Sequence, residues 1–226
     1  MTTVTGHRGA GALAPENTLA SFRTALECGV DTIEFDVRET AAGELVVIHD
    51  DTLERTTDGR RRVSETTLAK IATLDAGDGE QVPALADALE YLLESDVGLR
   101  IELKERGLGE RVLEQVLEYG LAERTTFSSF DDEAFDGLGD SPVSIGFISF
   151  EVTEDALETV ERVGAESLFV NLDSVTAADL ERVRTHDVEL GVWTVNSVEG
   201  VERALTLGVD SITTDRPDMV LEQLRE

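Results

Sequence analysis

Short runs of β-branched and aromatic residues alternate along the chain with amphipathic segments of helical periodicity. The strand-like runs are residues 3–7, 31–37, 99–104, 125–130, 144–149, 167–172, 189–195 and 211–215. The helical segments that follow them are residues 15–29, 83–95, 110–120, 131–138, 152–164, 176–186, 198–208 and 217–226. This alternation is typical of a parallel α/β fold. Eight strand–helix units in 226 residues favour a TIM (β/α)8 barrel over an open doubly wound sheet.

One region, residues 39–82, departs from this repeat. It contains a ninth strand-like run, ELVVIHD at residues 44–50, which follows a turn-like stretch and precedes polar, glycine-containing sequence. We interpret it as a hairpin arm on the second strand, followed by a small insertion in the second βα connection. Long connections of a barrel commonly lie over its active face. We therefore expect one TIM-barrel domain over residues 1–226, with residues 39–82 inserted near the site.

Three acidic residues lie in consecutive strands of the expected barrel, near the carboxyl ends where barrel enzymes place their chemistry. Glu34 and Asp36 are two residues apart in the second strand, so both side chains point to one face, and Glu102 lies in the third strand. Three ionised carboxylates cannot share a barrel interior without compensating positive charge. Carboxylate oxygens suit a hard cation, so the pattern predicts a Mg²⁺ or Ca²⁺ site. Salt bridges to neighbouring basic residues are the alternative interpretation.

Two of the three histidines end strand-like runs beside charged residues. These are His7 and His49, whereas His186 ends an expected surface helix. An unperturbed imidazole titrates near neutral pH, so His7 and His49 suit general acid–base catalysis. Arg8 and Lys104 supply positive charge for an anionic substrate. Together with a metal ion, these groups predict phosphodiester cleavage, in which one histidine deprotonates the nucleophile and the other protonates the departing alkoxide.

Composition limits the partners. The chain has 48 acidic and 19 basic residues, a formal net charge of −29, so we expect no nucleic-acid partner and no stable membrane association. Lys70 and Lys104 are its only lysines. An acidic, lysine-poor surface predicts a halophilic protein, because concentrated salt screens its self-repulsion. A single cysteine excludes an intramolecular disulfide, and the N-terminal residues show no signal peptide. We expect a cytoplasmic protein with a small-molecule substrate; the oligomeric state stays open.

Seven segments carry a family resemblance. In order between residues 6 and 218 they read HRGAGALAPENTLASF, GVDTIEFDVRET, GELVVIHDDTLERTTDG, IELK, FSSF, VWTVN and GVDSITTDRPD. In these motifs the chain resembles the glycerophosphodiester phosphodiesterase family, within the wider phosphatidylinositol-phospholipase-C-like barrels. The resemblance implies a TIM barrel with a small insertion after the second strand. It also implies hydrolysis of a glycerophosphodiester to glycerol 3-phosphate and an alcohol, with Mg²⁺ or Ca²⁺ as cofactor.

The same resemblance implies roles for eight side chains. It places His7 and His49 on the catalytic pair, Glu34, Asp36 and Glu102 on the metal ligands, Arg8 and Lys104 on phosphate-contacting positions, and Trp193 on an aromatic wall beside the alcohol portion. The first nucleophile, either water or the glycerol hydroxyl of the substrate, stays open. Two alternative functions remain: a phospholipase-like lyase or transferase acting on a lipid phosphodiester, and a non-catalytic barrel that binds phosphorylated metabolites.

Overall fold

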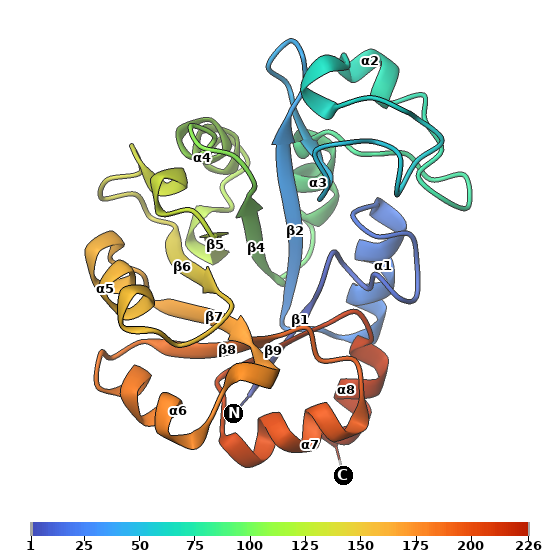
Figure 1. The fold of residues 1–226 in the computed structure, drawn as a ribbon. Coiled ribbons are helices and arrows are strands. Elements are labelled where there is room, and N and C mark those ends of the chain that lie inside the picture. The colour runs from blue at the N-terminus through green and yellow to red at the C-terminus, as the bar shows by residue number, and fades with distance from the viewer. Residues whose placement is uncertain (1, 226) are drawn as a thin grey trace.

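A computed structural model describes residues 2–225, in which strands and helices alternate as the hydrophobic pattern predicts (Figure 1). The strands are β1 Thr3–Gly6, β2 Thr32–Glu39, β3 Leu45–Val47, β4 Gly98–Leu103, β5 Thr125–Ser129, β6 Ser144–Ser149, β7 Ser167–Asn171, β8 Glu189–Trp193 and β9 Ser211–Thr214. The α-helices are α1 Leu19–Cys28, α2 Leu68–Ile71, α3 Leu85–Leu92, α4 Gly109–Glu118, α5 Glu154–Val163, α6 Ala177–Arg184, α7 Val198–Leu207 and α8 Pro217–Gln223. Among the helices within residues 2–225, none combines the length and the hydrophobicity needed to cross a bilayer.

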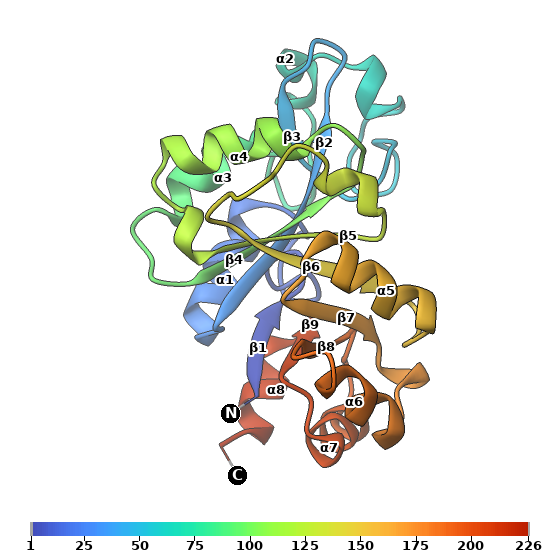
Figure 2. The ribbon, with the colours of Figure 1, turned by 90° about the vertical axis from the view of Figure 1, so that its left-hand side faces the viewer.

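Eight parallel strands close into a barrel. Strands β4 to β9 pair in chain order, β2 pairs with β4, and β1 joins both β2 and β9, which completes the ring. Helices α1 and α3 to α8 surround these strands (Figures 1 and 2). The last helix, α8, packs against β1 and α1, so the two ends of the chain meet in the same part of the barrel. The predicted TIM (β/α)8 fold is confirmed.

Alternation along the strands divides apolar from polar side chains. Six apolar residues at odd-numbered positions of β2 and β4 are at most 1% exposed and belong to the main hydrophobic core, which the strands share with the helices: Ile33, Phe35, Val37, Leu99, Ile101 and Leu103. Full burial of such a side chain contributes roughly 1.5–3 kcal/mol. The even-numbered residues Glu34, Arg100 and Glu102 point the opposite way and line a cavity inside the barrel. The apolar pattern that builds the core therefore also fixes which side chains face the site.

The first helix starts later than its sequence pattern predicts. Thr18 is its N-cap, accepting a hydrogen bond from the Ser21 backbone N–H, and Ser21 in turn accepts one from the Thr18 backbone N–H. Residues 15–17 are therefore not helical but form a turn that presents two polar side chains to the barrel mouth. The helix ends as predicted at Gly29, whose φ of 88° gives a left-handed cap.

The prediction of a helix over residues 131–138 is wrong. The chain forms only a 3-10 turn there, η3, from Asp132 to Phe135. The Asp131 side chain caps this turn by accepting from the Glu133 N–H at 3.2 Å. Asp136 then leaves helical geometry with ψ 136°, and Gly137 adopts φ 85°. Gly137 within the segment and Gly139 just after it lower the helical propensity there, which the apolar spacing alone did not reveal.

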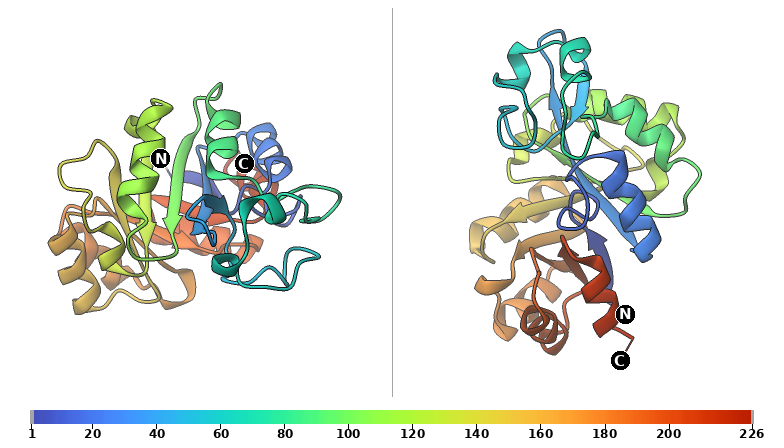
Figure 3. Two further views of the ribbon diagram at one scale, coloured as in Figure 1. Left: turned by 90° about the horizontal axis from the view of Figure 1, so that it is seen from above. Right: turned by 90° about the vertical axis from the view of Figure 1, so that its right-hand side faces the viewer.

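The segment between β2 and β4 extends beyond the ring of helices. Strand β3 pairs antiparallel with the end of β2, with Val37 opposite Val47. The following residues form a 3-10 turn and α2, and the whole segment lies where β2 ends (Figures 1 and 3). A separate small apolar cluster holds it together: Val46, Ile48, Leu53, Val63, Ile71, Leu74, Ala76 and Val82. The carboxyl end of β2 is thus covered by a segment that has a small hydrophobic core of its own.

Inside the barrel, two glycines make room for one aromatic ring. A Cβ at Gly146 on β6 would lie 2.4 Å from Cε2 of Phe169, and one at Gly191 on β8 would lie 2.5 Å from its Cδ1. Both distances are shorter than the nonbonded contacts that a Cβ atom makes in folded proteins. The Phe169 ring is 7% exposed and extends from β7 across the interior. The glycines therefore determine which side chain fills this level of the barrel.

We predict that Gly146→Ala lowers the free energy of unfolding by about 1–3 kcal/mol, because the new methyl group overpacks the Phe169 ring. Urea unfolding followed by circular dichroism measures it. In a Phe169→Leu background the same substitution should be clearly less destabilising, since Phe169 supplies all the close contacts at this position. Equal destabilisation in both backgrounds would contradict this explanation.

Candidate active site

A cluster of three acidic side chains occupies the carboxyl ends of β2 and β4. Glu34 and Asp36 come from β2 and Glu102 from β4, where the strand register places Asp36 beside Glu102. They are 2%, 0% and 9% exposed, respectively. One carboxylate oxygen of each lies within 4.8 Å of the others. Burial of three acids at this spacing demands compensation by donors and positive charge.

Two basic residues and one backbone amide provide part of this compensation. The Lys104 ammonium lies 2.5 Å from Oε1 of Glu102 and 3.5 Å from Oδ1 of Asp36. Nε of Arg8 lies 3.5 Å from Oδ2 of Asp36. The backbone N–H of Arg8 donates to Oε2 of Glu34 at 2.8 Å, from a residue whose φ is 51°. The left-handed backbone at Arg8 thus turns both its amide and its guanidinium toward the acids.

Asn17, in the turn before α1, adds a neutral hydrogen-bond donor to the acid cluster. Nδ2 of Asn17 donates to Oδ2 of Asp36 at 2.8 Å, and its Oδ1 accepts from the Asp36 backbone N–H. Asn17 itself has φ 58°, a left-handed conformation that asparagine tolerates. The turn that precedes the first helix is therefore part of the site, and braces the acid that lies deepest.

The surroundings shift the pKa values of two of these acids in opposite directions. Burial raises the pKa of Asp36, but the charges of Lys104 and Arg8 outweigh it and hold that pKa below its usual range. For Glu102, burial and the neighbouring Asp36 carboxylate dominate over Lys104 and raise its pKa to about 7. The basic groups around the cluster therefore leave it short of positive charge.

The acid cluster fits a hard divalent cation. Oδ1 of Asp36 is buried and has no hydrogen-bond partner among the described residues. The cluster offers three carboxylate oxygens and no sulfur or nitrogen ligand, the donor set of Mg²⁺ and Ca²⁺ rather than of zinc or copper. A bound cation would satisfy that oxygen and supply the missing positive charge. Glu34, Asp36 and Glu102 are the residues that could hold it.

The two histidines are held in the same way. Nδ1 of His7 lies 2.6 Å from Oδ1 of Asp215, and Nδ1 of His49 lies 2.6 Å from Oδ1 of Asp50. A carboxylate accepting from Nδ1 places the ring proton there and leaves Nε2 to exchange protons. Nε2 of His7 is turned toward the acid cluster, 4.0 Å from Oε2 of Glu34. Each imidazole is therefore oriented as an acid–base group.

The electrostatic environments of His7 and His49 differ. Burial lowers the pKa of His7, but Glu34 and the hydrogen bond to Asp215 outweigh it, so the pKa is raised overall. For His49, burial and the positive charge of Lys104 lower the pKa more than nearby carboxylates raise it. The two imidazoles of the site therefore have different proton affinities.

A chain of ion pairs connects the second histidine to the acid cluster. Starting from the carboxylate that holds His49, it runs from Asp50 to Arg55 (2.6 Å), Glu16 (2.8 Å), Arg8 (2.7 Å) and Asp36 (3.5 Å). The hydrogen bonds from Arg55 hold the pKa of Asp50 well below its usual range. Because Arg55 lies in the segment after β3, this network joins that segment to the barrel.

Both histidines and part of the acid cluster line one cavity of about 270 Å³. Its ionic side is lined by His7, Arg8, Glu34, His49 and Glu102. Its opposite side is aromatic: Trp193 lies 5.8 Å from Phe130 and 5.6 Å from Phe150, measured between ring centroids. A charged wall opposite an aromatic wall suits a ligand with an anionic centre and a less polar substituent.

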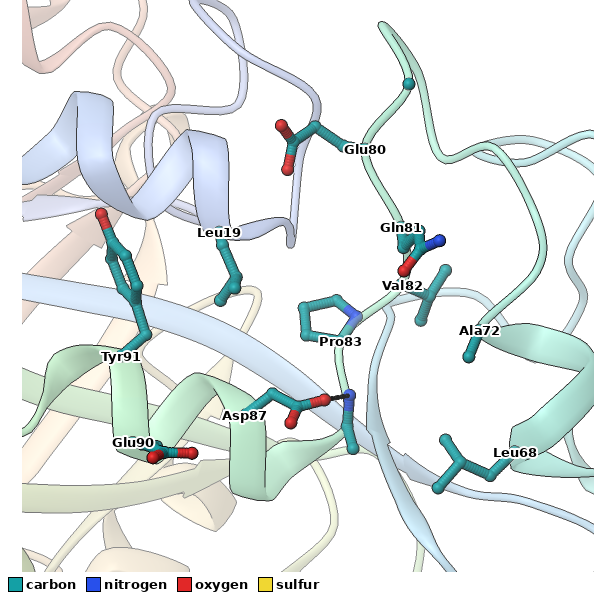
Figure 4. Close-up of a pocket in the computed structure, with 12 residues that line it drawn as sticks. Leu19, Leu68, Ala72, Glu80, Gln81, Val82, Pro83, Asp87, Glu90 and Tyr91 are labelled. Carbon is teal, nitrogen blue, oxygen red and sulfur yellow. Dashed lines mark hydrogen bonds between the residues drawn. The ribbon is translucent and has the colours of Figure 1, made fainter.

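A second, larger cavity of about 570 Å³ lies outside the barrel, between α1, α3 and the loop before α3 (Figure 4). The carboxylates of Glu80, Asp87 and Glu90 are on its lining, and Asp87 accepts from the Ala84 backbone N–H at 3.2 Å. Its lining includes no histidine, lysine or arginine. Of these two cavities, the one inside the barrel is therefore equipped for acid–base chemistry on an anion.

Comparison with known proteins agrees with this geometry. Residues 7–219 match the model of the Glycerophosphoryl diester phosphodiesterase family. The chain is 35% identical, over 239 aligned positions, to the glycerophosphodiester phosphodiesterase of Caldanaerobacter subterraneus subsp. tengcongensis, a match covering 100% of this chain and 98% of that protein. The chain belongs to the glycerophosphoryl diester phosphodiesterase family.

Solved structures of similar proteins have the same fold. The glycerophosphodiester phosphodiesterase of Agrobacterium tumefaciens superposes with a TM-score of 0.87 at 32% identity, covering 98% of this chain and 100% of that one. An Oleispira antarctica phosphodiesterase, solved in complex with the product sn-glycerol-3-phosphate, superposes with a TM-score of 0.91 at 27% identity, covering 100% and 98%. The family expected from the motifs is confirmed, and with it the class of enzyme, a phosphodiesterase.

The structure brings together all eight side chains that the sequence singled out for this family's site. Six line the cavity: His7, Arg8, Glu34, His49, Glu102 and Trp193. Asp36 and Lys104 join the same cluster through the ion pairs above. His186, which we expected on a surface helix, does not line this cavity and pairs with Glu161 at 2.7 Å. The salt bridges considered as the alternative to a metal site also form, through Arg8 and Lys104.

Sequence reasoning did not pair either histidine with the carboxylate that positions it, and it missed the two phenylalanines of the aromatic wall. Asp50 immediately follows His49, and that adjacency was an available signal. Asp215 directly follows β9, 208 positions after His7, and only closure of the barrel makes them neighbours. Phe130 and Phe150 follow β5 and β6 and carry no charge that would mark them. Phe130 lies within the FSSF segment, a weak signal at best.

We predict that Asp215→Asn and Asp50→Asn each lower kcat for phosphodiester hydrolysis about 100-fold or more, with little change in KM. An amide can donate to Nδ1, which stabilises the wrong imidazole tautomer. Steady-state kinetics measures the effect. Asp218→Asn is the matched control, since among the described residues this carboxylate forms its ion pair with the exposed Arg216 alone. Wild-type kcat in both variants would mean that the histidines need no orienting carboxylate.

Proposed function

We propose that this protein hydrolyses glycerophosphodiesters to glycerol 3-phosphate and an alcohol, in a metal-dependent reaction with two-histidine acid–base catalysis. The observation that carries the proposal is the shared cavity. It combines two imidazoles, each held at Nδ1 by a carboxylate, with a buried acid cluster. The product-bound relative, in complex with sn-glycerol-3-phosphate, supports the same substrate class.

The acid cluster holds the metal in this proposal. Glu34, Asp36 and Glu102 are its ligands, and the donor set favours Mg²⁺ or Ca²⁺. When bound, the cation neutralises charge that develops on the phosphoryl oxygens. Arg8 and Lys104 add positive charge at the edge of the cluster, where they attract and orient the anionic diester.

The histidines move the protons. Through Nε2, one of His7 and His49 accepts a proton from the nucleophile, which is water or the glycerol hydroxyl of the substrate. The other donates a proton to the departing alkoxide, an unactivated leaving group that needs one. Trp193, with the two phenylalanines beside it, forms the aromatic wall against which the alcohol portion lies.

The fold and the surface complete the proposal. The chain acts as one domain over residues 1–226, and residues 39–82 are an insertion that covers the carboxyl end of β2; the ion pairs of Arg55 support this role. With a formal net charge of −29, the protein works in a salt-rich cytoplasm, where counterions screen its self-repulsion.

A metal-removal experiment tests the reaction. Chelation should abolish release of glycerol 3-phosphate from glycerophosphocholine, and added Mg²⁺ or Ca²⁺ should restore it. Glu34→Gln should lower metal-dependent kcat at least about 100-fold, because it removes one anionic ligand. Glu90→Gln, in the cavity outside the barrel, is the matched control. Turnover that ignores the chelator would refute the metal requirement, and accumulation of a cyclic phosphate as the end product would indicate a lyase.

We predict that raising KCl from about 0.1 M to about 2 M increases the urea concentration at the unfolding midpoint. The screening length falls from about 10 Å to a few Å, so repulsion among the surface acids weakens. A neutral osmolyte at equal osmolality serves as the control and should raise the midpoint less. A midpoint that falls or stays constant with salt would contradict the halophilic interpretation.

A further inference from the structure

One buried cation of the barrel interior has no part in the reaction described above. Arg100 lies on β4, two residues before Glu102, and is only 6% exposed. Its Nη2 donates to Oγ1 of Thr213 at 2.9 Å. Its Nε and Nη1 are buried and have no hydrogen-bond partner among the described residues. Arg100 lines the same cavity as the histidines, so these unpartnered donors belong to the site.

The guanidinium is held by an aromatic ring instead of a carboxylate. Its Cζ lies 4.2 Å from the ring centroid of Phe169, a cation–π contact. Gly146 and Gly191 leave the space that this ring needs. Within residues 2–225, no carboxylate forms an ion pair with Arg100. The fold thus fixes a positive charge inside the barrel without neutralising it by contact.

The register of the two strands places Arg100 on β4 directly beside Glu34 on β2. Burial lowers the pKa of Arg100 more than the carboxylates of Glu34, Glu102 and Asp36 raise it. A guanidinium stays protonated in proteins even so. Three acids, Glu34, Asp36 and Glu102, therefore share the barrel interior with the basic side chains of Arg8, Lys104 and Arg100.

We propose that Arg100 is a built-in counter-charge that weakens divalent-cation binding to the free protein and makes that binding depend on an anionic phosphate ligand. The proposal rests on the metal site of the proposed function. With Arg100 beside Arg8 and Lys104, a divalent cation entering the cluster gains less net attraction than it would without the Arg100 charge. A phosphate ester in the same cavity adds negative charge and restores that attraction. By linkage, the metal strengthens binding of the phosphate ester by the same factor.

Calorimetric titration with Mg²⁺ and with Ca²⁺ tests this without measuring turnover. Arg100→Met keeps much of the side-chain length and removes the charge, and Arg100→Lys keeps the charge. We expect Arg100→Met to bind the cation at least about tenfold more tightly than wild type. Arg100→Lys should stay within about threefold of wild type. A structural role alone would affect both variants alike, since both lose the planar contact with Phe169.

The same titrations with saturating glycerol 3-phosphate measure the coupling. The phosphate ester should tighten cation binding in wild type by a larger factor than in Arg100→Met. Circular dichroism verifies that each variant is folded, and Arg100→Gln replaces the methionine variant if that one unfolds. Equal cation affinity in wild type and in the folded uncharged variant would overturn the proposal.

Glu34→Gln separates this proposal from the proposed function. If Glu34→Gln abolishes cation binding while Arg100→Met leaves it unchanged, the metal site stands and the counter-charge role is refuted. If Glu34→Gln binds the cation as wild type does, the acid cluster is not the metal site and both proposals fall. Loss of binding in Glu34→Gln together with tighter binding in Arg100→Met supports both.

Discussion

Burial of three carboxylates in one cluster is the constraint on which the rest of this site depends. Glu34, Asp36 and Glu102 have oxygens within 4.8 Å of one another in the barrel interior. Removing such charges from water costs several kcal/mol each unless donors and cations replace the lost hydration. The compensating groups, Arg8, Asn17 and Lys104, come from different strand ends and from the turn before α1. The cluster is therefore tolerable only once the barrel has closed.

The surrounding ion pairs show how the two histidines are coupled to that cluster. Arg55 and Glu16 link the carboxylate behind His49 to Arg8, which reaches Asp36. Asp215 positions the other histidine from the far end of the chain. Charged groups that hold one another in this way lose little entropy when a ligand binds, which is the physical advantage of a preorganised site. Gly146 and Gly191 contribute in the same way, because the space they leave holds the Phe169 ring in place inside the barrel.

The sequence predicted much of the fold because the barrel repeats one simple pattern. Alternation in β2 gave both the core residues Phe35 and Val37 and the inward direction of Glu34 and Asp36, since a strand has only two faces. The pattern failed over residues 131–138, where the apolar spacing suggested a helix but the chain leaves helical geometry at Asp136 and Gly137. It also placed the start of α1 too early, because the capping geometry at Thr18 depends on reciprocal contacts with Ser21.

By itself, the sequence determined the fold class, the family and the residues that converge on the cavity, because strand ends of a parallel barrel meet at one edge. Tertiary structure alone decided which groups pair. Asp215 and His7 are 208 positions apart, and nothing local marks them as partners. The same holds for Arg100: its periodicity shows that it faces inward, as Glu102 does, yet only the packing of Phe169 from β7 leaves its charge unpaired. Periodicity assigns a side chain to a face, whereas electrostatic partners depend on distances between strands that are remote in sequence.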